Sequence, residues 1–335
     1  MTTPAPALSL VADIGGTNTR VALAQGAQLL PATIRRFRNI DYPGLEPILR
    51  SYLQREAGVS CTGVCVAVAG PIANGVATMT NLDWTIDGAA LMRATGATQV
   101  AILNDLQAQG HALGHIAAEN LRPILQGPDA APQDTKLVIG VGTGFNAAPV
   151  HETPMGRIVA ASECGHVNLP VRDAADLKLA AFLSAAHGFP GVEDALSGRG
   201  LERLFAFVSA QAGQTDLLKA PDIMSAVVAE AGQGIASDTA RLFVRLLGAT
   251  AGNLALTHLP FGGIYLCGGV SRAFASHLAP MRFKAAFRDK GRFAGFMQKF
   301  SVSVIEDDYA ALTGSAVYLA TTTPHKFNAA HLPKA

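Results

Sequence analysis

Charged residues are scarce in this chain of 335 residues, since Asp, Glu, Lys and Arg together make up only 15% of it. The charges also nearly cancel, with a formal net charge of +1. Such a balance does not favour a nucleic acid or an anionic membrane surface as a partner. We therefore expect a small-molecule partner, with no nucleic acid and no membrane.

The chain has only four cysteines, and no two of them form a C-x-x-C pair. A chain of this length buries enough surface to fold without disulfide bonds. Cys61 and Cys65 fall on one face of the alternating strand VSCTGVCVAVAG, where we expect reduced core residues. Cys164 and Cys267 are isolated. The cytoplasm is therefore the natural compartment.

Signals for export or membrane insertion are also missing. The opening MTTPAPALSL has no basic region before its apolar run, and Asp13 interrupts that run early. We expect neither a signal peptide nor a spanning helix. Hydrophobic residues make up 49% of the chain and glycine is abundant, which is typical of a globular protein. The length suggests roughly two domains.

The common nucleotide-binding motifs are absent as well. GVGTGF, at residues 140–145, is G-x-G-x-G and not G-x-G-x-x-G, and no G-x-x-x-x-G-K-[ST] occurs. A dinucleotide site or a P-loop is therefore disfavoured. Backbone amides at glycine turns can still bind phosphate. Gly268 and Gly269 allow two interpretations, a close contact between helix and strand or a flat floor for a nucleotide.

Strand and helix patterns alternate over the first hundred residues. Strands are expected at 8–14, 20–26, 59–70 and 98–105, with a helix over 45–58, which predicts an α/β sheet with helices on its faces. The segment LVIGVGTGFNAAPV matches LVADIGGTNTRVA, so Gly142-Thr143 falls under Gly15-Gly16. Each domain would then begin with a glycine-tipped hairpin. The rest is mainly helical, with stripes over 196–213 and 238–259 and a last strand over 301–308.

The first hairpin, ADIGGTNTRVA, ends a buried strand with an aspartate and turns without side chains. In an ordinary hairpin, glycine only supplies a positive φ. In a binding site, the bare backbone approaches an anion that carries a metal ion. The hairpin alone does not separate these interpretations.

Asn104-Asp105 follows the apolar strand 100–103 and precedes an expected helix. Ligands of open α/β sheets bind beyond the carboxyl ends of the strands, which suits an acidic residue there. The alternative is a helix N-cap, the commoner role for these residue types.

Glu163, His166 and Glu193 are the other candidates. Ionised carboxylates suit a polyhydroxyl ligand, because each accepts two hydrogen bonds from adjacent hydroxyls. A metal site of Glu163, Cys164 and His166 is disfavoured because no second Cys/His cluster completes it. Taken singly, Glu193 could be surface charge and His166 a structural histidine.

A series of motifs occurs in a fixed order: D-I-G-G-T-N-x-R, A-G-P with M-T-N-x-x-W, L-N-D-L, G-x-G-T-G, E-x-G-H, E-x-x-L-S-G-x-G-L and C-G-G-V. In this order the chain resembles the bacterial glucokinase family, within the hexokinase–actin–heat-shock ATPase superfamily. The likeness runs from about Leu10 to beyond Gly314. It implies a two-domain actin-like ATPase (ribonuclease H-like) α/β fold with an interdomain cleft. The smaller domain would comprise 1–112 and 313–335, and the larger one, with helical insertions, 113–312.

The resemblance implies ATP-dependent phosphorylation of a hexose 6-hydroxyl, with glucose as the first candidate, and ATP and Mg²⁺ as cofactors. Asp105 would be the catalytic base. The sugar ligands would be Asn81, Asn104, Asp105, Asn146, Glu163, His166 and Glu193. The nucleotide and its phosphates would contact Asp13, Gly15, Gly16, Thr17, Asn18, Gly142, Thr143, Gly268 and Gly269, with Asp13 holding Mg²⁺ through water.

One departure from the family pattern concerns Asn146, which stands where the bacterial family has glycine in G-T-G-x-G. It is similar to the asparagine of G-T-G-x-N in eukaryotic hexokinases, which touches the sugar. We hypothesise an amide contact to a hexose hydroxyl, or else an altered sugar preference.

The alternatives are a kinase for another hexose or an amino sugar, and a non-catalytic nucleotide or sugar sensor. The chain lacks the C-x-C-G-x-x-G-C zinc cluster of the repressor–kinase relatives, and its first strand begins near Leu8. A DNA-binding sensor is therefore not expected. A homodimer is expected by analogy with relatives.

Overall fold

The computed structural model of the chain describes residues 7–70, 72–73, 75–79 and 82–322. The chain forms two compact units. Unit 1 comprises Met1–Ile116 and Asp307–Ala335, and unit 2 comprises Ala117–Glu306. Each unit is built on its own sheet.

The main sheet of unit 1 has the strand order β3-β2-β1-β5-β9, and β4 also pairs with β2. Strands β1, β5 and β9 run parallel, while β1 and β2 form the predicted hairpin. The strands are β1 (Leu8–Ile14), β2 (Asn18–Gln25), β3 (Gln28–Leu29), β4 (Arg35–Arg38), β5 (Cys61–Val68) and β9 (Gln99–Asn104). A small second sheet holds β6 (Ile72–Ala73), β7 (Val76–Thr78) and β8 (Thr85–Asp87).

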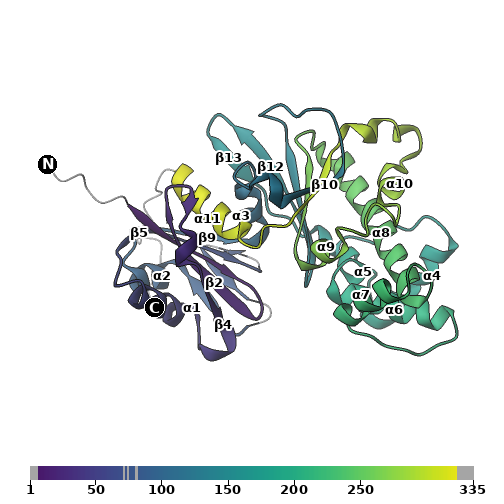
Figure 1. Cartoon of the computed structure of the whole chain (residues 1–335), viewed down its shortest axis with the longest axis horizontal. Coiled ribbons are helices and arrows are strands. Elements are labelled where there is room, and N and C mark those ends of the chain that lie inside the picture. Colours follow the sequence, from purple (N-terminus) through teal and green to yellow (C-terminus); the bar gives the residue numbers. More distant parts are fainter. Residues whose placement is uncertain (1–6, 71, 74, 80–81, 323–335) are drawn as a thin grey trace. The chain divides into compact units, whose positions relative to one another are not determined.

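Helices cover both faces of this sheet, with α1 and α2 on one face and α3 and α11 on the other (Figure 1). They are α1 (Leu45–Arg55), α2 (Gly88–Thr95), α3 (Asp105–Ala112) and α11 (Ala310–Thr321), with 3₁₀ turns at Pro31–Thr33 and Asn39–Asp41. Helix α1 buries its residues 45, 48, 49 and 52, the spacing of one helical face. Helix α11 therefore belongs to unit 1 although it follows unit 2 in sequence.

Cys61 and Cys65 are both buried, as expected, but they do not share a face of β5. Cys61 packs in the core under α1, and Cys65 packs in the core under α3 and α11. The register between β1 and β5 shifts between Leu8 and Ser9, which leaves Thr62 as an extra residue and inverts the alternation. Burial raises the pKa of Cys61 to about 11 and that of Cys65 to about 12, so both thiols stay protonated.

The sheet of unit 2 has the strand order β10-β15-β14-β11-β12-β13. Strands β11, β14 and β15 run parallel, and β11 and β12 form a hairpin. Both sheets therefore contain a hairpin whose first strand also pairs, on its other edge, with a parallel strand. This confirms the repeat of glycine-tipped hairpins, but the second hairpin does not begin its unit, because strand β10 precedes it. The strands are β10 (Leu121–Leu125), β11 (Lys136–Val141), β12 (Phe145–Thr153), β13 (Gly156–Val159), β14 (Ile264–Cys267) and β15 (Val302–Ile305).

The helices of unit 2 share one large core with its sheet. They are α4 (Ala174–His187), α5 (Val192–Ala195), α6 (Gly198–Gln211), α7 (Ala220–Ala229), α8 (Ile235–His258), α9 (Gly269–Phe274) and α10 (Phe283–Arg288), with 3₁₀ turns at Ala118–Asn120, Cys164–His166, Gly291–Phe293 and Phe296–Lys299. Helices α4 to α8 gather together in Figure 1. Among the described residues, no helix is both long and apolar enough to cross a membrane.

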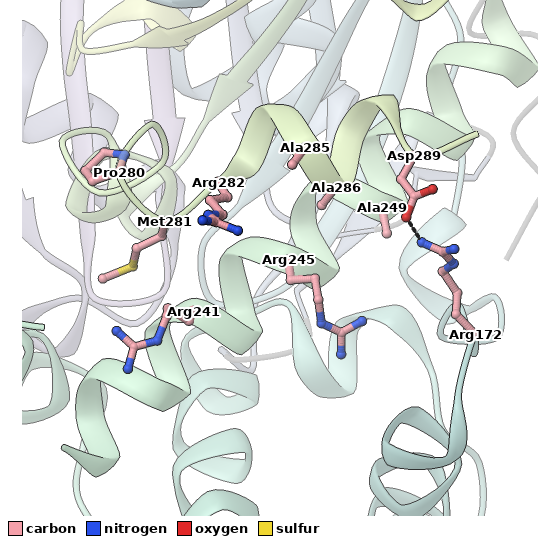
Figure 2. Close-up of a pocket in the computed structure, with 10 residues that line it drawn as sticks. All are labelled: Arg172, Arg241, Arg245, Ala249, Pro280, Met281, Arg282, Ala285, Ala286 and Asp289. Carbon is pink, nitrogen blue, oxygen red and sulfur yellow. Dashed lines mark hydrogen bonds and ion pairs between the residues drawn. The ribbon is translucent and has the colours of Figure 1, made fainter. Parts of the chain in front are cut away.

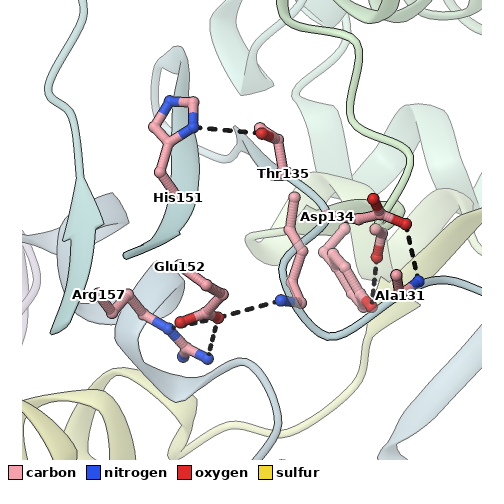
Figure 3. Close-up of polar contacts among 9 residues, drawn as sticks. Ala131, Asp134, Thr135, His151, Glu152 and Arg157 are labelled. Carbon is pink, nitrogen blue, oxygen red and sulfur yellow. Dashed lines mark hydrogen bonds and ion pairs between the residues drawn. The ribbon is translucent and has the colours of Figure 1, made fainter. Parts of the chain in front are cut away.

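An ion-pair cluster links strands β11, β12 and β13 at the end of the second hairpin (Figure 3). Lys136 on β11 and Arg157 on β13 both donate to Oε1 of Glu152 on β12, with nitrogen–oxygen distances of 3.0 and 2.6 Å. Burial alone would raise the pKa of Glu152. The hydrogen bonds and positive charges of Arg157 and Lys136 outweigh burial and lower the pKa below its usual 4.5.

We predict that this cluster stabilises the fold only while Glu152 is ionised. A lowered folded-state pKa gives stability that is present above the unfolded-state pKa and is lost as the pH falls through the folded-state value. Glu152→Gln should lower the free energy of unfolding by about 1 kcal/mol at neutral pH. The difference from wild type should vanish in acid, as measured by urea unfolding against pH. The control is Glu119→Gln, at an exposed position, and an equal acid dependence of both variants would contradict the prediction.

Candidate functional site

The predicted residues of unit 1 meet at one edge of its sheet. Strands β1, β5 and β9 end level with one another, because Ile14 pairs with Val68 and Val68 pairs with Asn104. Asp13 and the Asn104-Asp105 pair therefore lie two strands apart, roughly 10 Å at the usual strand spacing. Parallel strands bring their carboxyl ends together, so residues 91 positions apart in sequence become neighbours.

Asp13 lies across the hairpin from Arg20, with 3.4 Å between Oδ2 and the guanidinium nitrogen. Its side chain keeps 19% of its surface accessible. Mg²⁺ in phosphate sites takes one or two carboxylates and completes its shell with water and phosphate oxygens. Asp13, an accessible carboxylate next to a glycine turn, fits that requirement.

The glycine turn of this hairpin is held by a buried asparagine that the sequence motifs did not reveal. Asn39 is 2% exposed. Its Nδ2 donates to the carbonyl of Gly15 at 2.8 Å, and its backbone N–H donates to the carbonyl of Thr17 at 2.9 Å. The Thr19 hydroxyl donates to its Oδ1 at 2.8 Å. The side chain and backbone of Asn39 therefore hold the turn through its carbonyl groups.

Gly16 and Gly142, at the tips of the two hairpins, are not required by the packing. A Cβ at either position would meet no atom within 4 Å. Neither residue has a positive φ. The fold would accept alanine at both places, so an ordinary hairpin does not explain the glycines. A bare backbone that a phosphate approaches does explain them.

Asn104 is the N-cap of α3, which was the alternative interpretation of the pair. Its Oδ1 accepts from the Leu106 N–H at 3.0 Å, and the Gln107 side chain accepts from the Asn104 N–H at 3.0 Å. Its Nδ2 donates to the Gly70 carbonyl at 3.3 Å. Asp105 is the first helical residue, and its Oδ1 also accepts from Leu106 at 2.9 Å. The capping box thus fixes the backbone that carries the Asp105 carboxylate at a helix start, where negative charge is favoured.

In unit 2 the second glycine turn packs against Glu193. The Phe145 N–H donates to Oε2 of Glu193 at 2.9 Å, and a Cβ on Gly144 would lie 2.5 Å from that oxygen. The buried Ser197 hydroxyl donates to the Glu193 carbonyl at 2.9 Å and caps α6 through the Gly200 N–H. Ser197 of the motif E-x-x-L-S-G-x-G-L therefore helps to hold Glu193 beside the turn.

Asn146 links β12 to the segment that carries the next candidates. Its Nδ2 donates to the Ser162 carbonyl and, at 3.2 Å, to Oε2 of Glu163. Its Oδ1 accepts from the Ala147 and Cys164 N–H groups at 2.8 and 3.1 Å. Both amide hydrogens are therefore used inside the protein, and one of them orients Glu163.

Glu163, His166 and Glu193 come together although 30 residues of sequence separate the first from the last. The segment after His166 runs beside the start of α5, where the Val192 N–H donates to the Val167 carbonyl at 3.0 Å. Glu163 and His166 are exposed, and Glu193 is half-buried. Two carboxylates and an imidazole on one side of a glycine turn are suited to binding a polyhydroxyl compound.

The metal alternative for this segment gains no support. No group of three or more His, Cys, Asp and Glu side chains within the described part of the chain could hold a metal ion. Burial raises the pKa of the Cys164 thiol, which disfavours the thiolate that a metal would need.

Gly268 ends β14, the parallel neighbour of β11. Its φ is +95°, and a Cβ there would lie 2.4 Å from the Val141 carbonyl oxygen. The close-contact interpretation therefore holds for Gly268. Gly269 begins α9, is exposed, and has no atom within 4 Å of its Cβ position. Gly142, Thr143, Gly268 and Gly269 thus share one edge of the unit 2 sheet.

The predicted residues therefore form two sets, one in each unit. Unit 1 brings together Asp13, Gly15, Gly16, Thr17, Asn18, Asn104 and Asp105. Unit 2 brings together Gly142, Thr143, Asn146, Glu163, His166, Glu193, Gly268 and Gly269. Asn81 lies outside the described residues.

Comparison with known sequences settles which family these motifs belong to. A sequence model named Glucokinase matches residues 10–322. The chain belongs to the glucokinase family. It is thus an enzyme of ATP-dependent glucose phosphorylation, as the order of the motifs predicted.

Relatives within the family are similar over nearly their whole lengths. A glucokinase of Marinobacter nauticus is 34% identical over 92% of this chain and 96% of its own. The crystal structure of a glucokinase from an Antarctic psychrotroph is 30% identical, with a TM-score of 0.83 over 94% of this chain and 99% of that one. A glucose complex of Balamuthia mandrillaris glucokinase, 22% identical with a TM-score of 0.79 over 96% of each chain, shares the fold. The actin-like two-domain α/β class is thereby confirmed.

We predict that Asn39 matters for ATP use although it lies beneath the turn. Asn39→Ala leaves the Gly15 carbonyl and the Thr19 hydroxyl without this partner, so it should cost about 1–3 kcal/mol of stability. The loosened turn should also raise the KM for ATP about tenfold while the KM for glucose is retained.

The matched control is Tyr52→Phe, which removes a 2.9 Å hydrogen bond to the Thr33 carbonyl in the same unit. It should lower stability without changing the KM for ATP. If both variants shift that KM equally, Asn39 has no specific role in the turn.

Proposed function

We propose that this glucokinase-family enzyme transfers the γ-phosphoryl group of ATP to the 6-hydroxyl of glucose, with Asp105 accepting the hydroxyl proton. One observation carries the proposal. In unit 1, Asp13 and Asp105 lie at the carboxyl ends of parallel strands, and in unit 2 the turn at Gly142 lies beside Gly268 at the same edge and contacts Glu193. Unit 1 would supply a carboxylate base beside a bare turn, and unit 2 would supply carboxylates for hydroxyls beside a second bare turn.

Sugar binding in this proposal depends on ionised carboxylates. Glu163 and Glu193 would each accept hydrogen bonds from neighbouring hydroxyls, while His166 and Asn104 would contact further hydroxyls. The rigid support of Glu193 by Ser197 and the Phe145 N–H means that little side-chain freedom is lost on binding. Asn81 remains a prediction for the same set.

The phosphates of ATP would lie against backbone amides of the two hairpin turns, over Gly15–Asn18 in one unit and Gly142–Thr143 in the other. Gly268 and Gly269 would support the adenosine. Asp13 would hold Mg²⁺ through water, and the bound ion would neutralise charge on the phosphates.

Asp105 would hold the sugar hydroxyl in line and take its proton. An ordinary aspartate is a weak base at neutral pH, with a pKa of roughly 4. Phosphoryl transfer tolerates a weak base because the reaction depends mostly on positioning and charge neutralisation. We propose that the two units, as the two predicted domains, close on their ligands and exclude water so that the phosphoryl group reaches the sugar.

The cytoplasmic location and the homodimer remain predictions. The mass in solution decides the oligomeric state.

Asp105→Asn should lower turnover by about 10²–10⁴-fold, because the amide cannot accept the proton. Glucose binding, measured by calorimetry, should persist. The control Asp87→Asn changes another aspartate of unit 1, the N-cap of α2, and should retain turnover. Turnover of Asp105→Asn close to wild type would disprove the role of the base.

The substrate assignment is tested by ADP release from Mg-ATP with glucose, mannose, fructose, glucosamine and N-acetylglucosamine. Glucose should give the highest kcat/KM. A clear preference for another sugar would favour the alternative hexose or amino-sugar kinase, and no ADP release with any sugar would favour the sensor.

We further propose that Asn146 acts on the sugar through Glu163, since both of its amide hydrogens are used by protein acceptors. Asn146→Gly should raise the KM for glucose about tenfold by releasing that carboxylate. In a Glu163→Gln background the same change should have no further effect, which a double-mutant cycle measures.

Ser162→Ala is the control for this cycle. It removes the Ser162 hydroxyl bonds to Asn146 and Ala147 but not the bond to Glu163, so the KM for glucose should stay unchanged. Fully additive effects of Asn146→Gly and Glu163→Gln would instead support the direct sugar contact predicted from the sequence.

A further inference from the structure

Unit 2 contains a pocket whose lining includes none of the predicted site residues. Its volume is about 390 Å³, which is in the range of small-molecule sites. Helices α8 and α10 form its walls, together with the segments before α4 and before α10 (Figure 2). Arginine is prominent in the lining, with Arg172, Arg241, Arg245 and Arg282.

Two of the arginines are held in place by carboxylates. Arg245 makes two hydrogen bonds to Asp176, whose side chain is 1% exposed. The same carboxylate accepts from the backbone N–H of Arg172 at 3.1 Å. The Arg172 guanidinium pairs with Asp289 at one end of the pocket, where both side chains are about half exposed (Figure 2). The buried Asp176 carboxylate therefore orders Arg245 and the backbone of Arg172 before any ligand arrives.

The other two arginines are less firmly held by carboxylates. Arg241 donates to the Gly232 carbonyl at 2.9 Å and pairs with Asp238 on its own helix, whose side chain is 59% exposed, so the ion pair is weak. Among the described residues, the Arg282 side chain makes no ion pair. Three carboxylates thus pair with four guanidinium groups, and one positive charge remains at Arg282.

Arg282 also adopts an unusual backbone conformation. Its φ is +66°, in the left-handed region, and it is the N-cap residue of α10. A non-glycine residue there costs about 1 kcal/mol. Glycine would adopt this backbone conformation without that cost, so the local fold does not explain why an arginine stands here.

The rest of the lining is apolar. Met281, a proline and three alanines form the surface between the arginines. A guanidinium group binds a phosphate or carboxylate with two parallel hydrogen bonds, and an apolar floor suits a carbon skeleton.

We propose that this pocket binds a small organic oxyanion, a phosphate or carboxylate on an apolar body, with Arg282 and Arg241 contacting the charged group. The proposal does not depend on the function proposed above. The shared chemistry is the oxyanion, and the test separates phosphate from carboxylate.

The test measures binding of phenyl phosphate, benzoate and inorganic phosphate to the whole chain by ligand-observed NMR, with glucose and a non-hydrolysable ATP analogue present to fill the catalytic site. Phenyl phosphate or benzoate should bind, and the tighter of the two identifies the group. Inorganic phosphate should bind about tenfold more weakly because it lacks the apolar contact. Equal binding of inorganic phosphate would overturn the proposed ligand class.

Two variants locate the site. Arg282→Gly keeps the left-handed backbone without strain and removes the guanidinium, and Arg241→Ala removes the second one. Each should weaken binding about tenfold while glucose phosphorylation is retained. Arg93→Ala, at an exposed position in unit 1, is the control and should bind like wild type. No binding to the wild type, or equal binding by all three variants, would overturn the proposal.

Discussion

The pairing of parallel strands at level ends is the constraint on which the candidate site depends. In unit 1 it places Asp13 and Asp105 at one edge of the sheet, and in unit 2 it places the turn at Gly142 beside Gly268. The sheet positions them because every parallel strand presents its carboxyl end to the same side, where the backbone turns away and leaves room for a ligand.

Two side-chain amides, one buried and one half-buried, then orient the groups that the sheets bring together. Asn39 holds the first turn, and Asn146 holds the segment of Glu163, in each case with donors and acceptors both satisfied. A network whose members are all hydrogen-bonded is rigid, because breaking any member leaves a partner unpaired. The glycines fall into two groups. A side chain at Gly268 would clash with the neighbouring strand, whereas a side chain at Gly16 or Gly142 would clash with nothing in the described part of the chain.

Local pattern predicted the strands β1, β5 and β9, the helices α1, α6 and α8 and the duplicated hairpin, since these depend on periodicity and turn chemistry, but it did not predict helix α4 or strand β10. It failed at Cys61 and Cys65, where one extra residue in β5 inverts the alternation. For Asn104, local pattern favoured a helix cap, which the structure confirms, while the family resemblance predicted a sugar ligand, which stays a prediction. A single bulge or cap is decided by the partner strand or helix, which a window of sequence does not contain.

The order of the motifs along the chain was enough to assign the family and to predict which groups bind phosphate and hydroxyls. What surrounds those groups became visible in the folded chain: the support of the first turn by Asn39, the hydrogen bond from Asn146 to Glu163, and the four arginines that line one pocket. Motifs are short and can be recognised locally in the sequence. Contacts between distant segments arise only when the sheets and helices pack, because packing alone brings residues such as Arg241 and Arg282 to the lining of one pocket.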